Sequence, residues 1–528
     1  MDVTQARAGL VRISAGPRLQ ALMLQCRGNL VYVLLVTVAA LYIAAFAGSG
    51  LLRALFPYPF DGLEPGALQE VARIRAGQPI YVAPTLEYVP QIYGPVYFYL
   101  AAAVAAVSRS DLLGLRLVSL LASLGSIAFV TLLVRRETGS LGIGLVGGAL
   151  LSACGPLVNG TLDLGRTDAT SLLFMLAAIF AARVASLEPN ATWRSSAVCG
   201  GLMAVSLLTK QSGAPVAVAL FAILALNRRN QVAAYLLGLA LTAGLGVLIL
   251  AAQSGPWLFF YLWELPRQHQ ILPELMSRFW ADAVTRFSVP LLVGPFYLVA
   301  RALAGDKRRV VFYAAIWLAM VGMAWVSDAT IRGGRNVEVP AYAAWAMLFA
   351  LALHEALSHI GSASARSRAG RMYLLAATIG QFAILVYNPR LVIPYRSDAW
   401  AGERLSATLA ALPGPIFAGS YQGFVQSSPD IVAPDLAAVV EIQGEQVRPS
   451  TPEGDQWAGY LAGALNTRQF AYVIVNPDID AFTVPLLCDA YGYVDAGALF
   501  PAGDKFWEWR TGWVPKAEVY VRPQPGTR

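Results

Sequence analysis

The feature that most constrains this chain is a series of long apolar segments separated by short, arginine-rich breaks. Residues 29–50, 112–134 and 231–252 each approach or exceed the helix length that crosses a bilayer core of about 30 Å. Hydrophobic residues make up 57% of the 528 residues, and charged residues only 13%. One or two soluble cores would not need so many apolar segments. The sequence therefore predicts an α-helical polytopic membrane protein.

The basic residues predict the orientation of the chain. The net charge is +7, but Arg and Lys lie in the breaks between apolar segments. This pattern sets topology in a membrane and does not indicate nucleic-acid binding. Four arginines precede the first apolar segment, so we expect residues 1–28 to be a cytoplasmic segment followed by a retained first helix rather than a cleaved signal peptide. The expected location is the cytoplasmic (inner) membrane.

One apolar segment is expected not to cross. Residues 95–107 are about 13 residues long, and at a rise of about 1.5 Å per residue they cover about 20 Å. All the arginine-rich breaks face the cytoplasm together only if this segment stays in the outer leaflet. We therefore expect about eleven spans, at residues 29–50, 112–134, 141–159, 168–186, 195–209, 213–227, 231–252, 288–303, 309–327, 337–357 and 371–388.

Two external loops are expected to carry short amphipathic helices. In the loop of residues 53–110, Pro65 suits the first turn of such a helix and Gly77 its C-terminal cap. In the loop of residues 253–287, apolar residues recur at helical spacing from Leu272 to Phe287, and charges of alternating sign follow another face. Helices of this kind lie along the membrane interface or pack against the bundle. The pattern is compatible with both.

The composition changes after the last expected span. Residues 395–528 are more polar and contain β-like runs at 415–419, 472–476 and 517–522, with a helical pattern at 457–465. We therefore expect an external soluble α/β domain, which in a bacterial envelope is periplasmic. The four cysteines are scattered, without CxxC spacing, and predict neither a disulfide nor a zinc site.

Polar side chains gather at four places that this topology puts at the external ends of spans. Ionisable residues at membrane depth are costly and are therefore functional candidates. Each cluster by itself is also explained by solvated loop charges, so their convergence on one face carries the argument. The clusters are Asp61 with Glu64; Asp163, Arg166 and Asp168; Lys210 with Gln211; and Arg332, Arg335 and Asn336.

These residue types suit transfer from a lipid phosphate. A phosphate leaving group needs fixed positive charge, which Lys210 and Arg166 offer. An acceptor hydroxyl needs a carboxylate base within reach, which Glu64 or Asp61 offers. Asp61 is alternatively a turn residue before a glycine, and Glu70 is expected to have a structural role.

The sequence leaves the roles of two further carboxylates open. Asp163 and Asp168 either hold a divalent cation through oxygen ligands or orient Arg166.

The order of these motifs resembles the polytopic GT-C glycosyltransferases, which include protein O-mannosyltransferases and the transferases that add aminoarabinose to lipid A. Residues 63–73 and 91–99 resemble the first external loop of that family. Residues 165–169 resemble its Arg-Pro-Asp segment, 208–213 its Leu-Thr-Lys segment, and 335–340 the segment that begins a late span. The resemblance covers roughly residues 29–390, and it implies the GT-C fold.

The resemblance also implies roles for individual residues. Glu64 occupies the catalytic acidic position, with Asp61 beside it. This chain departs from the pattern at Leu63, where the family usually has Asp, and at Tyr93-Gly94, where some members have Glu-Lys. The donor phosphate would be bound by Lys210, Arg166, Gln211 and Tyr93, and the acceptor or other substrate groups by Asp168, Asp163, Arg332, Arg335 and Asn336.

The function expected from the residues and the resemblance together is inverting sugar transfer on the external face of the membrane. The donor is a polyprenyl-phosphate-linked sugar, and the acceptor hydroxyl belongs to a lipid, a glycan or a protein. Two alternatives are a transporter or flippase of lipid-linked saccharides and a non-catalytic subunit that binds them. A transporter should show inverted repeats and broken midplane helices, and the sequence shows no convincing internal repeat.

Overall fold

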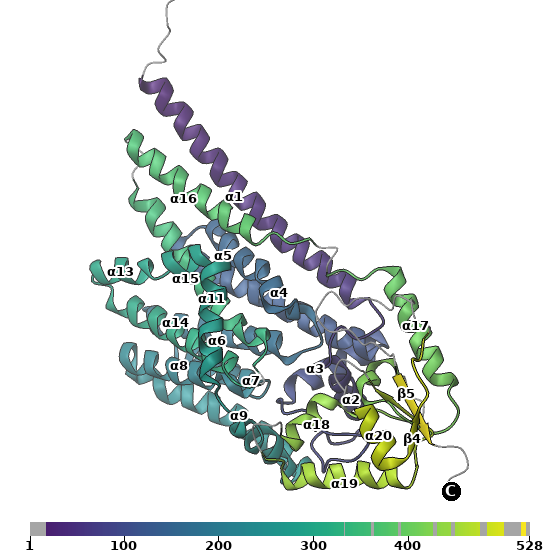
Figure 1. The fold of residues 1–528 in the computed structure, drawn as a ribbon. Coiled ribbons are helices and arrows are strands. Elements are labelled where there is room, and N and C mark those ends of the chain that lie inside the picture. Colours follow the sequence, from purple (N-terminus) through teal and green to yellow (C-terminus); the bar gives the residue numbers. More distant parts are fainter. Residues whose placement is uncertain are drawn as a thin grey trace, which may run out of the picture.

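The computed structural model describes residues 17–331, 333–360, 364–388, 392–425, 430–444, 449–475, 483–500 and 519–523. Long helices form the first part of the chain, and short helices and strands form the last (Figure 1). The helices of the first part are α1 (Pro17–Ala54), α2 (Glu64–Arg75), α3 (Val96–Ser108), α4 (Asp111–Thr138), α5 (Leu141–Ala153), α6 (Thr167–Leu187), α7 (Trp193–Leu207), α8 (Ala214–Asn227), α9 (Val232–Ser254), α10 (Trp257–Phe259), α11 (Met276–Arg286), α12 (Ser288–Val293), α13 (Phe296–Leu303), α14 (Lys307–Asp328), α15 (Val339–His359) and α16 (Ala365–Ile384).

Among the described residues, seven helices are long and apolar enough to cross a membrane. They are Leu30–Ala54, Asp111–Thr138, Leu141–Val158, Thr167–Leu187, Arg229–Ser254, Lys307–Asp328 and Arg335–His359. The protein is therefore a multi-pass, mostly helical membrane protein, as the sequence predicts. Every expected span falls on a helix, but several of these helices are short, and the number of spans stays a prediction.

The expected span at residues 288–303 is not one straight helix. Gly294 and Pro295 divide it into α12 and α13. The helical unit before it, Pro273–Arg286, meets this segment at a bend of 101°. Proline lacks the backbone N–H that a continuous helix needs, which is the local reason for the break. The two units together, Pro273–Arg286 and Ser288–Leu303, have the shape of a broken span or a re-entrant loop.

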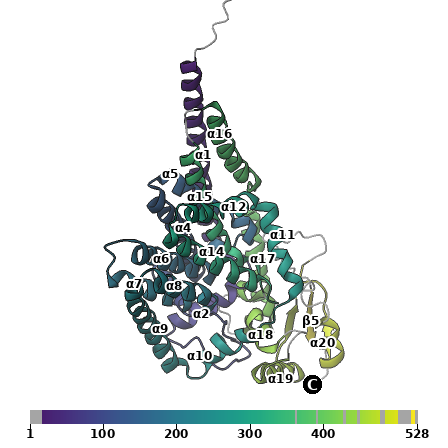
Figure 2. The same ribbon diagram turned by 90° about the vertical axis from the view of Figure 1, so that its left-hand side faces the viewer.

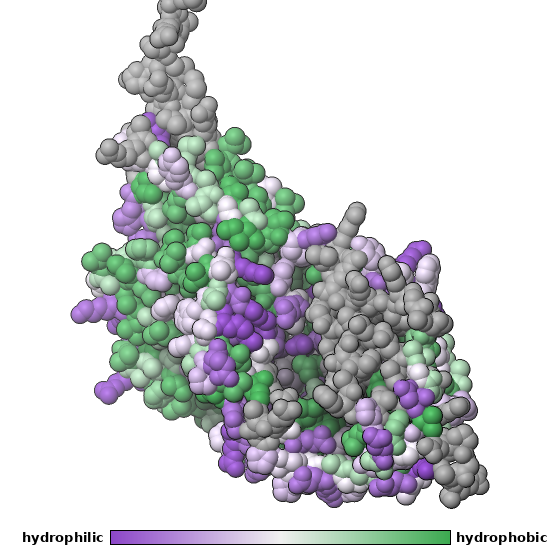
Figure 3. Space-filling view, viewed as in Figure 1, coloured by the Kyte–Doolittle hydropathy of each residue, from purple (hydrophilic) through white to green (hydrophobic). Residues whose placement is uncertain are grey.

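The surface of the helical part is apolar. The leucines of α9 at 236, 241, 245 and 248 are between 43% and 68% exposed, as expected where lipid replaces water. Figure 3 shows hydrophobic side chains over α8, α13 and α14, whereas polar side chains line the edge that carries α19 (Pro452–Asn466). α1 and α16 lie side by side and project from the bundle (Figure 2), joined by a hydrogen bond from Tyr42 Oη to the Phe382 carbonyl, 2.6 Å.

Small residues bring α7 and α9 into close contact. A Cβ atom at Gly200 would lie 2.0 Å from the Tyr235 carbonyl oxygen, and one at Gly238 would lie 2.0 Å from that of Ala197. Only glycine fits at these two positions, as is typical of helix pairs in membranes.

The last part of the chain is an α/β unit, as expected. Its helices are α17 (Arg396–Ala411), α18 (Leu436–Gln443), α19 and α20 (Thr483–Tyr491). The strands are β1 (Ile416–Phe417), β2 (Ile431–Val432), β3 (Tyr472–Val475), β4 (Tyr493–Asp495) and β5 (Val519–Pro523), in the sheet order β2-β1-β3-β5-β4. β1 is parallel to β2 and β3, whereas β5 is antiparallel to β3 and β4. The runs predicted at 415–419, 472–476 and 517–522 contain β1, β3 and most of β5.

This α/β unit packs on the two loops that carry the short helices. Trp457 Nε1 donates a hydrogen bond to the Thr85 carbonyl at 2.9 Å, and His269 Nε2 lies 2.8 Å from Glu441 Oε2. Thr85 belongs to the loop that contains α2, and His269 precedes α11. The α/β unit therefore contacts the same side of the bundle as both loops.

The second amphipathic helix, α11, packs against the bundle. Phe279 and Ala283 are buried, and the Trp280 ring lies 5.7 Å from that of Trp325 in α14. The charged face of α11 binds the loop before α15, where Asp282 pairs with Arg335.

Candidate active site

Glu64, the first residue of α2, is fully buried against Arg116 of α4. Arg116 Nε lies 2.8 Å from Oε1, and Nη2 lies 2.7 Å from Oε2. The backbone N–H groups of Gly165 and Phe60 donate to the same two oxygens at 2.8 and 2.6 Å. Burial alone would raise the pKa of Glu64, but the Arg116 charge and these hydrogen bonds lower it, so the side chain is ionised. In this arrangement both carboxylate oxygens accept hydrogen bonds from the protein itself.

Arg116 fixes the turn that leads into α2. Besides Glu64, its guanidinium donates to the backbone carbonyls of Arg53, Phe56 and Tyr58, at 3.1, 2.6 and 2.6 Å. Arg116 is not among the site residues predicted from the sequence. The signal was an ionisable residue inside an apolar span, which is costly unless it has a partner.

Asp61 is a turn residue, one of the two roles that the sequence left open, and it also pairs with Arg166. Its Oδ1 accepts hydrogen bonds from the backbone N–H groups of Leu63 and Glu64, at 2.9 and 3.0 Å, and so ends the turn before α2. Its Oδ2 accepts Arg166 Nε at 2.6 Å. The side chains of this pair are 10% and 15% exposed, in contrast to the 0% of Glu64 and Arg116. Among the described residues, no partner is recorded for the two terminal nitrogens of Arg166.

A second ion pair joins the other clusters. Lys210 Nζ lies 2.6 Å from Asp168 Oδ1, and Asn336 Nδ2 donates to the same oxygen at 2.9 Å. Lys210 Nζ also lies 5.5 Å from the centre of the Tyr93 ring. The loop meets the Lys210 segment at Gly94, where a Cβ atom would be 2.0 Å from the Leu208 carbonyl oxygen. Segments from four separate parts of the sequence therefore converge here, as expected.

Two small cavities border these pairs and share Asp168. The first has a volume of about 10 Å³ and is lined by Leu63, Gln91, Tyr93, Phe98, Gly165, Arg166, Thr167 and Asp168. The second, of about 20 Å³, is lined by residues that include Lys210, Ser171 and Asn336. Each is large enough for about one water molecule. The site is therefore closed in this structure.

Other predicted site residues lie elsewhere or are already bonded. Asp163 is buried and pairs with Arg53 at 2.8 Å, so it does not border the cavities. Gln211 Nε2 donates to the backbone carbonyls of Ile92 and Leu262, at 2.9 and 3.2 Å. It therefore ties two loops together and has no free amide hydrogen for a phosphate. Arg335 pairs with Asp282 of α11, and Arg332 is outside the described residues.

The carboxylates proposed as metal ligands do not form a site of the usual kind. Asp163 and Asp168 are each neutralised by a cationic side chain, Arg53 and Lys210. Among the described residues, no group of three or more His, Cys, Asp or Glu side chains could hold a metal ion. The other role left open was to orient Arg166. Asp163 pairs with Arg53 instead, whereas Asp168 pairs with Lys210 and lines the same cavity as Arg166.

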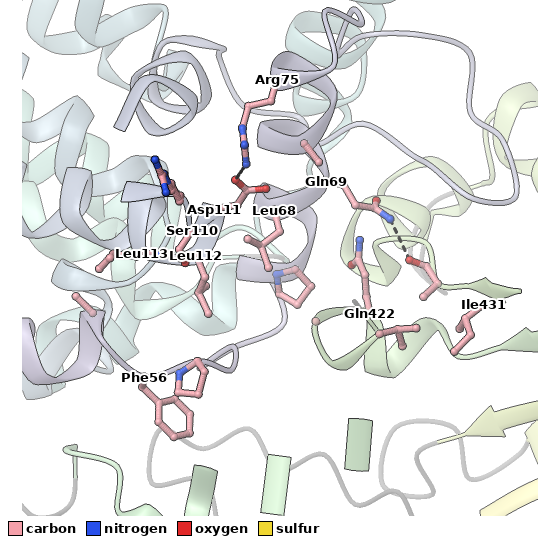
Figure 4. Close-up of a pocket in the computed structure, with 18 of the residues that line it drawn as sticks. Phe56, Leu68, Gln69, Arg75, Ser110, Asp111, Leu112, Leu113, Gln422 and Ile431 are labelled. Atoms are coloured by element: carbon pink, nitrogen blue, oxygen red, sulfur yellow. Dashed lines mark hydrogen bonds and ion pairs between the residues drawn. The ribbon is translucent and has the colours of Figure 1, made fainter. Parts of the chain in front are cut away.

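A separate, larger cavity of about 720 Å³ lies between the helical part and the α/β unit. It is bordered by the face of α2 that carries Pro65, Leu68, Gln69, Ala72 and Arg75 (Figure 4). Arg75 forms an ion pair with Asp111 at its wall. Neither Glu64 nor Arg166 lines it, so it is distinct from the two small cavities.

Comparisons with known proteins identify the fold. Residues 90–257 match the family model of dolichyl-phosphate-mannose-protein mannosyltransferases. ArnT from Cupriavidus metallidurans, in its crystal structure bound to undecaprenyl phosphate, has a TM-score of 0.58 at 13% identity, over 94% of this chain and 98% of that chain. The apo oligosaccharyltransferase of Archaeoglobus fulgidus has a TM-score of 0.59 at 13% identity, over 88% and 73% of the two chains.

A third structure, archaeal oligosaccharyltransferase AglB from Archaeoglobus fulgidus with an inhibitory peptide and a dolichol-phosphate, has a TM-score of 0.53 at 13% identity, over 84% and 71%. No curated protein sequence matches the chain. The partial family match and the shared fold together define the class: this is a membrane protein with the GT-C glycosyltransferase fold, which confirms the fold that the resemblance implied.

Proposed function

We propose that this protein is a membrane glycosyltransferase that moves a sugar from a polyprenyl-phosphate-linked donor to an acceptor hydroxyl. The observation that carries the proposal is the pair of partly exposed ion pairs, Asp61–Arg166 and Lys210–Asp168, on adjoining cavities. The fold adds support, because ArnT and AglB structures of the same architecture hold undecaprenyl phosphate and dolichol-phosphate. Both ligands are polyprenyl-type lipid phosphates.

The two cations are the proposed phosphate ligands. Arg166 uses only Nε for Asp61, so its terminal nitrogens are available for a phosphate oxygen, in the geometry that suits guanidinium groups. Lys210 is the second positive charge, with its ammonium held by Asp168 and beside Tyr93. Together they stabilise the negative charge that develops on the leaving phosphate.

Asp61 is the proposed base, in preference to Glu64. When the donor phosphate draws the Arg166 guanidinium, Asp61 Oδ2 loses its partner and can accept a proton. The acceptor oxygen then attacks the anomeric carbon, and its hydrogen moves to Asp61 Oδ2. The bond from that carbon to the phosphate oxygen breaks, and the lipid phosphate leaves with the electron pair. Attack opposite to the leaving group inverts the anomeric configuration.

The closed cavities add a requirement to this scheme. Volumes of about 10 and 20 Å³ cannot hold a sugar phosphate, so neighbouring segments must move apart when the donor binds. We place this event at the external face of the cytoplasmic (inner) membrane, with the α/β unit on the periplasmic side. The acceptor is a lipid, a glycan or a protein.

The test is release of free polyprenyl phosphate by the purified protein in detergent or liposomes, with a polyprenyl-phosphate-linked sugar as donor and candidate acceptors added in turn. Acceptor-dependent release, strongly reduced in Asp61→Asn, would support a transferase. Movement of intact donor across liposomes without release would instead identify a flippase. Donor binding without release or movement, with every acceptor class, would identify a binding subunit.

A further inference from the structure

One carboxylate of the α/β unit reaches the loop that carries the proposed base. Asp435, the residue before α18, is only 1% exposed. Its Oδ1 accepts the backbone N–H of Ala437 at 2.9 Å and so caps α18. Its Oδ2 accepts Gln91 Nε2, also at 2.9 Å. Asp435 therefore uses one oxygen for its own helix and the other for a residue 344 positions away in the sequence.

Gln91 passes this contact to the active-site turn. Its Nε2 group also donates to the Leu63 carbonyl at 3.1 Å, and the Leu63 N–H donates to Asp61 Oδ1 at 2.9 Å. Asp61 Oδ2 in turn accepts Arg166 Nε. A continuous series of hydrogen bonds thus links Asp435 to the Asp61–Arg166 pair. Leu63, Gln91 and Arg166 all line the same small cavity.

The packing around Asp435 leaves no free space. A Cβ atom at Gly66 of α2 would lie 1.8 Å from Asp435 Oδ2 and 2.3 Å from Gln91 Nε2. Glycine is unfavourable inside a helix relative to alanine, so its presence in the first turn of α2 has a packing reason. It lets the α/β unit approach the helix that follows Asp61.

We propose that Asp435 is a positioning residue for sugar transfer: through Gln91 and Leu63 it holds the Asp61 turn in register with Arg166. The α/β unit is then a working part of the active site, although Asp435 itself lines neither of the two small cavities. This inference rests on the proposed function, since it concerns the alignment of the proposed base.

The variant that tests it is Asp435→Asn. Asparagine caps a helix as well as aspartate does, but it has one acceptor oxygen where Asp435 uses two. The asparagine side chain therefore keeps the shape of aspartate but loses one of the two hydrogen bonds. We expect kcat to fall by about tenfold or more, because small displacements of a catalytic group are costly. The donor KM should change less than kcat, because Lys210, one of the two proposed phosphate ligands, does not belong to this series of bonds.

Gln69→Ala is the matched control. Gln69 Nε2 donates to the Ala433 carbonyl at 3.1 Å, so it also joins α2 to the α/β unit, about one turn beyond Gly66 (Figure 4). Within the described part of the chain, its other hydrogen bond goes to the Glu87 carbonyl at 3.3 Å, and none goes to Gln91 or the Asp61 turn. We expect kcat and KM of this variant to remain within about twofold of the wild-type values.

A second variant and a second measurement separate positioning from folding. Gly66→Ala improves helix propensity while pushing a methyl group onto Asp435 and Gln91, so it should reproduce the loss of kcat. In both variants, the backbone amides of Leu63 and Glu64 should exchange hydrogen faster than in Gln69→Ala. This exchange can be read even if no sugar transfer occurs, so a failure of the proposed function is distinguishable. Equal exchange and equal kcat in Asp435→Asn and Gln69→Ala would overturn the proposal.

Discussion

Two arginine–carboxylate pairs lie at the start of α2, and they differ in how far they are buried and in how many of their atoms are hydrogen-bonded. Glu64 and Arg116 are 0% exposed, and every oxygen of Glu64 is bonded. Asp61 and Arg166, three positions earlier and in the facing loop, are 10% and 15% exposed and border a cavity. A buried charge without its partner is costly, so the first pair suits stability. The second pair can exchange partners with a ligand, so it suits chemistry.

The largest difference between the two pairs should appear in Asp61→Asn. We expect it to fold, because the amide oxygen can still accept the N–H groups of Leu63 and Glu64. Without a base, kcat should fall by about 10²- to 10⁴-fold. Release of polyprenyl phosphate under saturating donor measures this loss, with Asp61→Glu as the variant that keeps the charge. Undiminished transfer by Asp61→Asn would remove Asp61 from the mechanism.

Glu64→Gln should act on stability instead. It leaves the Arg116 charge buried, and breaking a buried pair in this way costs about 3–5 kcal/mol. Thermal unfolding in detergent measures the change, and the folded fraction that remains should keep the wild-type donor KM. Combining Glu64→Gln with Arg116→Met should cost less than the sum of the single changes, because both remove the same ion pair. A stable Glu64→Gln variant without activity would instead return the role of base to Glu64.

The sequence could separate these pairs only in part. It identified Asp61, Glu64, Arg166 and Lys210 because charges between apolar segments are conspicuous. It could not tell which carboxylate is enclosed, because that depends on Arg116, which lies inside a span and meets Glu64 only after folding. The local sequence pattern identifies both carboxylates as candidates, whereas their different burial in the folded chain distinguishes them.

The helices and strands could likewise be predicted where the local sequence pattern determines them. The apolar segments, α2, α11 and three of the strands follow from periodicity and turn residues. The broken segment of α12 and α13, and the docking of Asp435 on α2, depend on contacts between residues far apart in the sequence. Such contacts have no signature in a single chain.

Lys210→Met tests the proposed role of the more exposed site in binding the donor phosphate. The lysine pairs with Asp168 in the closed site, and its proposed role is one charge-assisted hydrogen bond to phosphate, worth about 1.5–3 kcal/mol. We expect the donor KM to rise by about 10- to 100-fold, with a smaller effect on unfolding than that of Glu64→Gln. Binding of polyprenyl phosphate by the same variant is the direct check. Unchanged binding would contradict the role of Lys210.

The smallest effect is expected for Glu70→Gln, which makes on α2 the same glutamate-to-glutamine change as Glu64→Gln. Tyr88 Oη has one hydrogen but lies 2.6 Å from Glu70 Oε2 and 2.7 Å from the Ile80 carbonyl oxygen. A second hydrogen, on Glu70, satisfies both contacts. Burial raises the pKa of Glu70 to about 8, against the hydrogen bonds from Tyr88 and Gln91, so the folded protein holds this proton at neutral pH.

Glu70→Gln should therefore cost about 1 kcal/mol or less at pH 7, because the amide N–H replaces the carboxyl hydrogen. Between about pH 4.5 and 8 the folded wild type binds one more proton at Glu70 than the unfolded chain does, so its stability falls as pH rises. The variant should lose this dependence. Asp435, whose pKa burial raises to about 6, contributes the same sign in both proteins and does not affect the difference. Unfolding temperatures measured from pH 5 to 9 test this, and a loss as large as that of Glu64→Gln would mean that Glu70 is ionised too.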